Sequence, residues 1–534
     1  MRELKIPAAV KSRVRRPDRT LFALGALLAV GIALRGWLVY QYAPGFVGYD
    51  DSRGYLATLI APNLYWQPVR PAGYPIFLLV AKELSSHLRS AIVLQHALGV
   101  ATAVLLYLAV AKIVRRRWVA LLPAAVILLG GSQIYLEHAV VTESVFTFLV
   151  ALALWLGVLS IDSPRRALWL IPAGAAIGAA ITLRSVGITL IPGLMLWAVL
   201  AKSGSIRMRI AAPLAVLAGV LLTLGPYLLH QHSKTDSWGL TRTTGWTLAA
   251  RMSTFADCSK FTPPAGTEAM CDDPIPADKR PNAAAYQFDP AVSPALRKFG
   301  SPLADYTVDD PQRLAFAPDG LQRKFALAVV RHQFGTYLST VGDGLVKYVN
   351  PRWGRGRTLE WPQSTLITEL HNEGKENVSL PEAAIAYKQP LAFLRRASAP
   401  LDGYVRFANL EGWPTVLLVL LAAAGWVLAR GVQRTASALL GLVTLTLIIS
   451  PVALLFYGAR YAAPMYGPLA AAAALGLDSL VSARPGLTAR VRKLRNMRPR
   501  RPSGDRDSDE LSPANATNAS AAAKADREQH PDGR

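Results

Sequence analysis

Residues 21–40 read LFALGALLAVGIALRGWLVY, a long apolar run that directly follows a basic N-terminus. About 20 helical residues cross the ~30 Å hydrocarbon layer of a bilayer. The run ends in Trp37 and Tyr40, residue types that favour the headgroup boundary. A cleavable signal peptide has a shorter apolar stretch before a small-residue cleavage site, so an uncleaved first membrane helix is predicted.

Further apolar runs follow along the whole chain. Hydrophobic residues make up 52% of its 534 residues, and their grouping into long runs indicates an all-α polytopic membrane protein rather than a soluble core. The predicted spans are 21–40, 89–111, 118–136, 143–161, 167–183, 185–201, 210–230, 414–430, 436–457 and 462–481. The run 73–81 is too short to span and is expected to lie in the interface or to re-enter.

The net charge of +23 is typical either of nucleic-acid-binding proteins or of membrane proteins with basic cytoplasmic loops. The chain has no RNA-binding motif and no basic helix interleaved with stacking aromatics, so no nucleic-acid partner is predicted. With a cytoplasmic N-terminus, every predicted inward loop is basic. The loops carry Arg13, Arg15, Arg16, Arg19; Lys112, Arg115, Arg116, Arg117; Arg165, Arg166; Lys202, Arg207, Arg209; and Arg430, Arg434, before a basic tail. A plasma-membrane protein with both termini in the cytoplasm is predicted.

This alternation defines the domain organisation. We expect a basic cytoplasmic N-terminus (1–20), a transmembrane module (21–230) whose first external loop is 41–88, an extracytoplasmic mixed domain (231–413) between helices seven and eight, C-terminal membrane helices (414–482) and a disordered cytoplasmic tail (483–534). Within the large loop, apolar residues of 321–349 recur at helical spacing, which predicts an amphipathic helix that lies on the membrane or packs on the domain.

The only two cysteines, Cys258 and Cys271, both fall in this large loop. An oxidising compartment allows such a pair to form a disulfide, which is the prediction. The alternatives are two free thiols or a metal site, and the lack of a nearby histidine disfavours zinc.

Asp50 and Asp51 follow the first helix in the external loop. Carboxylates near the membrane surface can act as a general base or bind a cation. The surrounding aromatic side chains are of a kind that commonly lines sugar sites; they are Tyr49, Tyr55, Tyr65, Trp66 and Tyr74. The alternative is a solvated loop in which an Asp caps a short helix beginning near Ser52.

Glu143, Arg184 and Arg460 lie at the same predicted outer boundary. Glu143 would favour the positive end of the fourth helix, but its position in an apolar run also predicts that it faces protein or a water-filled cavity. Arg184 and Arg460 can snorkel to headgroups or hold a phosphate with their planar forks. Tyr461 adjoins Arg460. The nearby His138 is more simply read as structural.

The order of these features resembles the GT-C class of membrane glycosyltransferases, in its dolichyl-phosphate-mannose–protein mannosyltransferase-like and aminoarabinose-transferase-like branch. The stretches that carry the resemblance are YDDSRGYL (49–56), RPAGYPIFL (70–78), LQHALG (94–99), TESVFTFL (142–149), LRSVGITLIPGL (183–194) and RYAAPMYGPL (460–469). The inserted segment 231–413 departs from the family pattern and leaves the acceptor open.

The resemblance implies a set of roles for these residues. Asp50 or Asp51 would be the catalytic base, with Asp51 slightly favoured, and Glu143 the second acidic residue, which shapes or polarises the acceptor site. Arg184, Arg460 and Arg70 would bind the donor phosphate, and Tyr49, Tyr55, Tyr74 and Tyr461 would line the acceptor or sugar.

The predicted activity is transfer of a hexose or pentose from a polyprenyl-phosphate sugar to an external protein, lipid or polysaccharide. No cofactor is certain, and a divalent cation is compatible with the site. The alternative is a transporter or flippase of a lipid-linked cell-envelope precursor, but such a protein would place its polar residues nearer mid-bilayer.

Overall fold

The computed structural model describes residues 19–47, 50–61, 63–201, 206–302, 318–350, 385–387 and 399–496. Within these ranges the regular secondary structure is helical, joined by loops and turns, and the β-structure in them is one isolated parallel bridge between Phe46 and Ala139. Tyr49, the N-terminus 1–18, most of 351–398 and the tail beyond 496 lie outside the described residues. Met1–Ala483 form one compact unit, distinct from Arg484–Arg534.

The first half of the chain alternates long helices with short ones. Its helices are α1 (Arg19–Gln41), α2 (Asp50–Thr58), α3 (Gly73–Leu84), α4 (Leu88–Ile113), α5 (Leu121–Leu129), α6 (Gly131–His138), α7 (Glu143–Ser160), α8 (Arg166–Leu183), α9 (Leu190–Leu200) and α10 (Ile206–Thr235). The 3-10 turns η1 (Arg117–Ala120) and η2 (Ser185–Thr189) lead into α5 and α9.

The second half begins with short helices and returns to long ones. These are α11 (Thr244–Ser253), α12 (Ala283–Phe288), α13 (Pro294–Phe299), α14 (Asp319–His332), α15 (Phe334–Val349), α19 (Ala399–Phe407), α20 (Trp413–Leu428), α21 (Gly431–Leu454) and α22 (Ala459–Asn496).

All ten predicted spans fall on helices, but the helices differ in whether they could cross a bilayer unaided. Among the described residues, α1, α4, α7, α8, α10 and α21 are long and apolar enough. A seventh span results if Arg117–Leu129 and Gly131–His138, bent by 47°, count as one. Ser185–Leu200 and Trp413–Leu428 are apolar but shorter. The chain is therefore a multi-pass helical membrane protein, while the number ten is not confirmed by these lengths.

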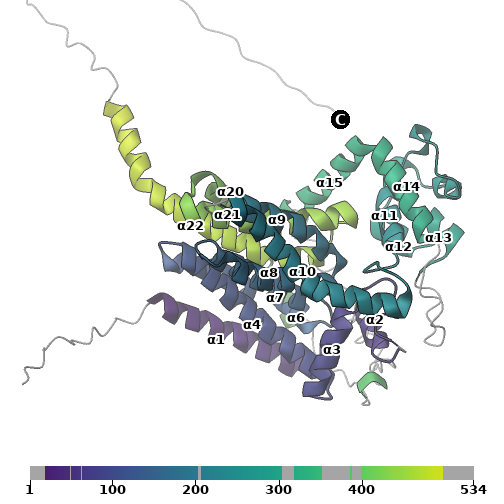
Figure 1. Cartoon of the computed structure of the whole chain (residues 1–534), viewed down its shortest axis with the longest axis horizontal. Helices are drawn as coiled ribbons and strands as arrows, with labels where there is room; N and C mark the ends of the chain where they lie inside the picture. Colours follow the sequence, from purple (N-terminus) through teal and green to yellow (C-terminus); the bar gives the residue numbers. More distant parts are fainter. Residues whose placement is uncertain are drawn as a thin grey trace, which may run out of the picture. The chain divides into compact units, whose positions relative to one another are not determined.

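Glycines allow the helices α8 and α10 to pack closely; the two run side by side in Figure 1. A Cβ at Gly219 of α10 would lie 2.0 Å from the carbonyl oxygen of Ile171, and one at Gly174 of α8 would lie 2.1 Å from that of Val216. Small residues at such contacts let membrane helices approach closely enough for extensive van der Waals contact.

The bundle has two chemically different ends. At one end Asp478 of α22 accepts hydrogen bonds from the backbone N–H groups of Arg115 and Arg116, at 3.1 and 3.3 Å. The chain after α20 lies at this end too, because Gln433 donates to Asp478 at 3.4 Å, and so does the chain after α7, where Arg166 packs on Trp197, which donates to the carbonyl of Thr435. The other end, called the site end below, holds the segments before α2, α7 and α22. The basic loops after α4, α7 and α20 are thus grouped in space.

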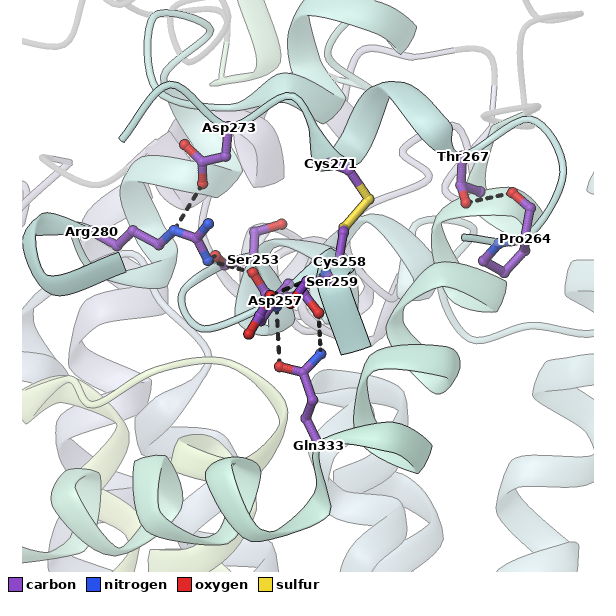
Figure 2. The surroundings of a disulfide bond; sticks show 11 residues. Ser253, Asp257, Cys258, Ser259, Pro264, Thr267, Cys271, Asp273, Arg280 and Gln333 are labelled. Atoms are coloured by element: carbon purple, nitrogen blue, oxygen red, sulfur yellow. Dashed lines mark hydrogen bonds and ion pairs between the residues drawn. A yellow bond between two sulfur atoms is a disulfide. The ribbon is translucent and has the colours of Figure 1, made fainter. Parts of the chain in front are cut away.

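The segment after α10 forms a small helical layer with its own apolar cluster, centred on Met252, Phe325 and Val329. In Figure 1, α11, α12, α13 and α14 lie together. The described part of 231–413 has helices and loops without strands, so the mixed character predicted for this domain is not seen there. Cys258 and Cys271 are joined by a disulfide, with Cα atoms 5.9 Å apart (Figure 2).

The predicted amphipathic helix over 321–349 is two helices, because the chain breaks at Gln333 between α14 and α15. The Gln333 side chain accepts from the N–H of Asp257 and donates to the carbonyl of the same residue (Figure 2). Each helix buries only part of its apolar positions: Phe325 of α14 and Val341 of α15 are buried, whereas Leu327, Phe334 and Leu338 are exposed. The sequence spacing alone could not reveal the break.

Candidate active site

Two loops far apart in the sequence are joined at the site end. After α1 the chain runs extended through Phe46, whose N–H donates to the carbonyl of His138 at 2.9 Å. The carbonyl of Phe46 accepts from the N–H of Val140 at 2.9 Å. These bonds fix the segment before α2 beside the segment before α7, so the two acidic motifs begin from adjacent points.

Asp51 lies in the first turn of α2, and the next residue anchors that helix. The Ser52 hydroxyl donates to the carbonyl of Val140 at 2.9 Å and is fully buried. Asp50 is the first residue of α2, as the short helix predicted near Ser52 requires. The contact of Ser52 with Val140 sets the position of Asp51 relative to Glu143.

Asp51, Glu143 and the three arginines predicted from the sequence form one continuous network, while the side chain of Asp50 lies outside what the structure describes. Arg70 donates from Nε to Asp51 at 2.5 Å. Arg460 bonds both Asp51 and Glu143, and Arg184 bonds Glu143 and, at 3.3 Å, the hydroxyl of Thr142. Segments separated by more than 400 residues therefore meet through one arginine.

The network is partly open to solvent at Asp51 and closed at Glu143. The side chain of Asp51 is 25% exposed and that of Glu143 is 1% exposed. The arginines lie between these extremes, at 11–15%. Among the site side chains that the structure describes, three guanidinium groups face two carboxylates, and +3 − 2 leaves one excess positive charge. Such a site favours an additional anion.

Burial and charge act in opposite directions on Asp51. Burial alone would raise the pKa of its carboxyl group, but the positive charges of Arg460 and Arg70 and their hydrogen bonds outweigh burial and lower the pKa below its usual range. Asp51 is therefore ionised at neutral pH and can accept a hydrogen bond.

The predicted aromatic residues divide between the network and the layer behind it. Tyr461 lies under Arg184 and Arg460, with its ring centroid 5.3 and 5.7 Å from their guanidinium carbons. Tyr55 lies 5.8 Å from Arg70 in the same way. Tyr74 packs edge-on against Tyr55, is fully buried and donates its hydroxyl to Gln95, so it supports the site from behind.

Sequence reasoning missed a second polar cluster directly behind the joined loops. Arg35, His96, Glu137 and His138 are each at most 4% exposed and hydrogen-bond one another. The available signal was the presence of polar residues inside apolar runs, such as Arg35 in the first span. Nothing in the spacing indicated that they would meet.

A divalent cation was compatible with the sequence. Across the described residues, no three His, Cys, Asp or Glu side chains gather in a way that could hold a metal ion. In the site itself, both described carboxylates are already paired with arginines.

Comparison with known families matches residues 70–230 to the family described as dolichyl-phosphate-mannose-protein mannosyltransferase. This range contains Arg70, Glu143 and Arg184, but begins after Asp51 and ends before Arg460. Comparison with curated protein sequences gives no match.

Several solved structures are distantly similar. The Saccharomyces cerevisiae protein O-mannosyltransferase Pmt1-Pmt2 complex bound to the sugar donor has 16% identity and a TM-score of 0.34, over 46% of this chain and 37% of that one. Archaeoglobus fulgidus oligosaccharyltransferase AglB has 14% identity and a TM-score of 0.43, over 90% of this chain and 52% of that one. Cupriavidus metallidurans ArnT bound to undecaprenyl phosphate has 15% identity and a TM-score of 0.35, over 89% of this chain and 80% of that one. The chain thus spans about half or less of the first two proteins.

Proposed function

We propose that this chain, a mannosyltransferase-like glycosyltransferase of the GT-C superfamily, moves a hexose or pentose from a polyprenyl-phosphate sugar to an acceptor hydroxyl outside the cytoplasm. The observation that carries the proposal is the single network in which Arg460 connects Asp51 with Glu143, flanked by Arg70 and Arg184. Its excess positive charge suits a phosphate, and its more exposed carboxylate suits a base.

The reaction is a direct displacement at the anomeric carbon. The acceptor oxygen forms a bond to that carbon while the bond from the carbon to the phosphate oxygen breaks, and its electron pair leaves with the polyprenyl phosphate. The acceptor proton passes to Asp51, which later releases it to water. Guanidinium groups stabilise the charge that develops on the leaving phosphate.

Arg460 connects donor binding to the basicity of Asp51. In the structure its guanidinium is paired with Asp51 and Glu143. A phosphate that accepts hydrogen bonds from Arg460 draws positive charge away from Asp51, and the pKa of Asp51 then rises toward that of a useful base. Glu143, which is almost completely buried, keeps Arg184 and Arg460 in position throughout.

The finer features of organisation complete the proposal. The chain crosses the plasma membrane ten times, with the bent pair α5–α6 and the short helices α9 and α20 among the crossings, and both termini are cytoplasmic. The site end faces outward, and 231–413 is an inserted extracytoplasmic domain before the C-terminal helices of 414–482. A donor with its polyprenyl tail in lipid then reaches the network from the outer leaflet.

The proposal is tested by Asp51→Asn, Asp50→Asn and the double variant, assayed with a set of polyprenyl-phosphate hexoses and pentoses in proteoliposomes. We expect Asp51→Asn to lower the transfer rate about 10²–10⁴-fold. Asp278→Asn, an exposed aspartate of the inserted segment, is the matched control and retains the rate. Full activity of the double variant would remove the proposed base.

The same assay separates transfer from transport. An enzyme releases free polyprenyl phosphate in amounts equal to the sugar transferred. A flippase moves the intact lipid-linked sugar across the bilayer and releases none. Movement of intact donor without release would replace this proposal by the transporter alternative.

A further inference from the structure

The side chain of Gln95, on α4, is fully buried and has three hydrogen-bond partners. Its Nε2 donates to the carbonyl oxygens of Glu137 and Ala139, at 2.9 and 2.8 Å, in the segment that leads to Glu143. Its Oε1 accepts from the hydroxyl of Tyr74 at 2.5 Å. Both amide hydrogens and the amide oxygen are therefore used, which fixes the orientation of the side chain.

The backbone of Gln95 also bonds the first turn of α7. The hydroxyl of Ser144 donates to the carbonyl of Gln95 at 3.0 Å. Ser144 directly follows Glu143, and both residues are only 1% exposed. Because Gln95 also bonds the carbonyl of Ala139, it holds the chain on both sides of residues 140–142. These bonds fix the point at which Glu143 begins α7.

Through Tyr74, the same glutamine supports the other acidic loop. The ring of Tyr74 packs edge-on against that of Tyr55, with centroids 4.7 Å apart. Tyr55 lies one helical turn after Asp51, on the same face of α2. Its ring centroid lies 5.8 Å from the guanidinium carbon of Arg70, which donates to Asp51. Gln95 is thus connected to the surroundings of both carboxylates of the network.

The next residue of α4 adds a second connection between the same loops. His96 lies 3.0 Å from the carboxylate of Glu137 and 3.0 Å from Nδ1 of His138. Nε2 of His138 lies 2.9 Å from the carbonyl oxygen of Tyr42, in the segment that runs from α1 to α2. Gly99, one turn further along α4, leaves the space that Glu137 occupies, because a Cβ there would lie 2.0 Å from Oε1.

We propose that Gln95 is a positioning residue for sugar transfer, which sets the place of Asp51 relative to Glu143 and to the bound donor. The proposal rests on the proposed function for its effect on the transfer rate. The hydrogen bonds of Gln95 go to neither Arg184 nor Arg460, the groups proposed to hold the donor phosphate. Loss of Gln95 should therefore impair the approach of the base more than the binding of the donor.

The test is Gln95→Met, which keeps the length of the side chain and removes its three hydrogen bonds. We expect kcat per folded enzyme to fall roughly 10–10²-fold, because a shift of about 1 Å at the reacting groups has an effect of this size. The KM for the polyprenyl-phosphate sugar should change by less than about threefold. A residue that only stabilised the fold would lower the amount of folded protein and leave kcat per folded molecule unchanged. Unchanged kcat, or a KM that rises as much as kcat falls, would overturn the proposal.

Tyr74→Phe tests the same connection with a smaller change, since it removes one hydroxyl and keeps the ring. We expect kcat to fall less than in Gln95→Met. In the Gln95→Met background the substitution should cause little further loss, because both changes break the same hydrogen bond. A Tyr74→Phe effect that is undiminished in that background would contradict the connection.

The matched control is Gln433→Met, at the opposite end of the bundle. Nε2 of Gln433 donates to the carbonyl of Leu475 at 2.9 Å and lies 3.4 Å from the carboxylate of Asp478. The same substitution of a hydrogen-bonded glutamine should here leave kcat per folded enzyme at the wild-type value. An equal fall of kcat in both variants would show that the effect of Gln95 is not specific to its place, and would overturn the proposal.

A second measurement needs no donor. The N–H of Phe46 donates to the carbonyl of His138, and the N–H of Val140 donates to that of Phe46, both at 2.9 Å. In Gln95→Met, hydrogen–deuterium exchange of these two amides should be about tenfold faster or more, while the amides of α14 keep their wild-type rates. Wild-type exchange at Phe46 and Val140 would overturn the proposal. Exchange does not depend on sugar transfer, so this proposal and the proposed function fail separately.

Discussion

Asp51 is held in its ionised form by two arginines, against the effect of burial. A depressed pKa means that the contribution of the ion pairs to stability is present above the unfolded pKa of about 3.9 and is lost only as pH falls through the lower, folded value. The free enzyme should therefore keep Asp51 ionised throughout the mildly acidic range.

This protonation state predicts the pH profile of kcat/KM, which reports groups of the free enzyme. Between pH 5 and 8 we expect no acidic limb from Asp51. The measurement is kcat/KM against pH for the wild type and for Asp51→Glu. An acidic limb within this range that shifts in Asp51→Glu would contradict the assigned state.

Arg460 is the residue whose loss should change both functions of the site. With Arg460→Met, the effect of burial on Asp51 is opposed by Arg70 alone, so the pKa of Asp51 should rise and bring an acidic limb toward the measured range. The KM for the polyprenyl-phosphate sugar should rise by about tenfold or more. Arg434→Met, which removes an exposed arginine at the other end of the bundle, is the control. Unchanged kinetics in Arg460→Met would show that this arginine neither binds donor nor tunes the base.

The sequence was informative about residue types but not about their pairing. Sequence reasoning could single out Asp51, Glu143, Arg184 and Arg460. A charged side chain at the edge of an apolar run costs free energy, so its presence there indicates a function. That Arg460 bridges both carboxylates depends on how α22 packs against α2 and α7, which no local pattern encodes. The cluster around Glu137 was missed for the same reason.

At the scale of elements, the contact between α8 and α10 determines where Arg184 lies, because α8 ends immediately before it. Gly219→Ala would place a Cβ 2.0 Å from the Ile171 carbonyl, and we expect a loss of about 1–3 kcal/mol from overpacking. Gly225→Ala in the same helix meets nothing within 4 Å and should be neutral or slightly stabilising. The measurement is the thermal midpoint of each variant. Equal midpoints for the two would mean that α8 and α10 are not held this closely.

Helix positions could be predicted well because apolar runs report burial in either lipid or protein. The structure nevertheless contains features that hydropathy does not distinguish, such as the 47° bend between Arg117–Leu129 and Gly131–His138. Likewise, residues 462–476 of α22 are all buried, so this predicted span is apolar because it is enclosed by other helices. Hydropathy alone treats an enclosed helix and a lipid-facing one alike.

At the scale of the whole molecule, the orientation in the membrane is testable because no described cysteine is free. Asp278→Cys, in the predicted external domain, should react with a membrane-impermeant maleimide in intact cells. Asp162→Cys, in a predicted cytoplasmic loop, should react only after permeabilisation. The unreduced wild type should not react in either state, since its two cysteines are bonded. Labelling of position 162 in intact cells would reverse the proposed topology.

The fold class could be predicted and the family resemblance recognised from the sequence, because both depend on patterns along the chain. The match at residues 70–230 agrees with the motifs recognised there. The acceptor could not be predicted. The segment most expected to select it, 231–413, carries no motif that points to a particular chemistry.

The most direct test is the structure of the protein, in a lipid nanodisc, with a polyprenyl-phosphate sugar bound to the Asp51→Asn variant. We predict the phosphate within hydrogen-bond distance of Arg184 and Arg460, with the anomeric carbon facing position 51. A phosphate bound instead at the opposite end of the bundle, beside Arg115–Arg117, would contradict the proposed site and the transfer mechanism with it.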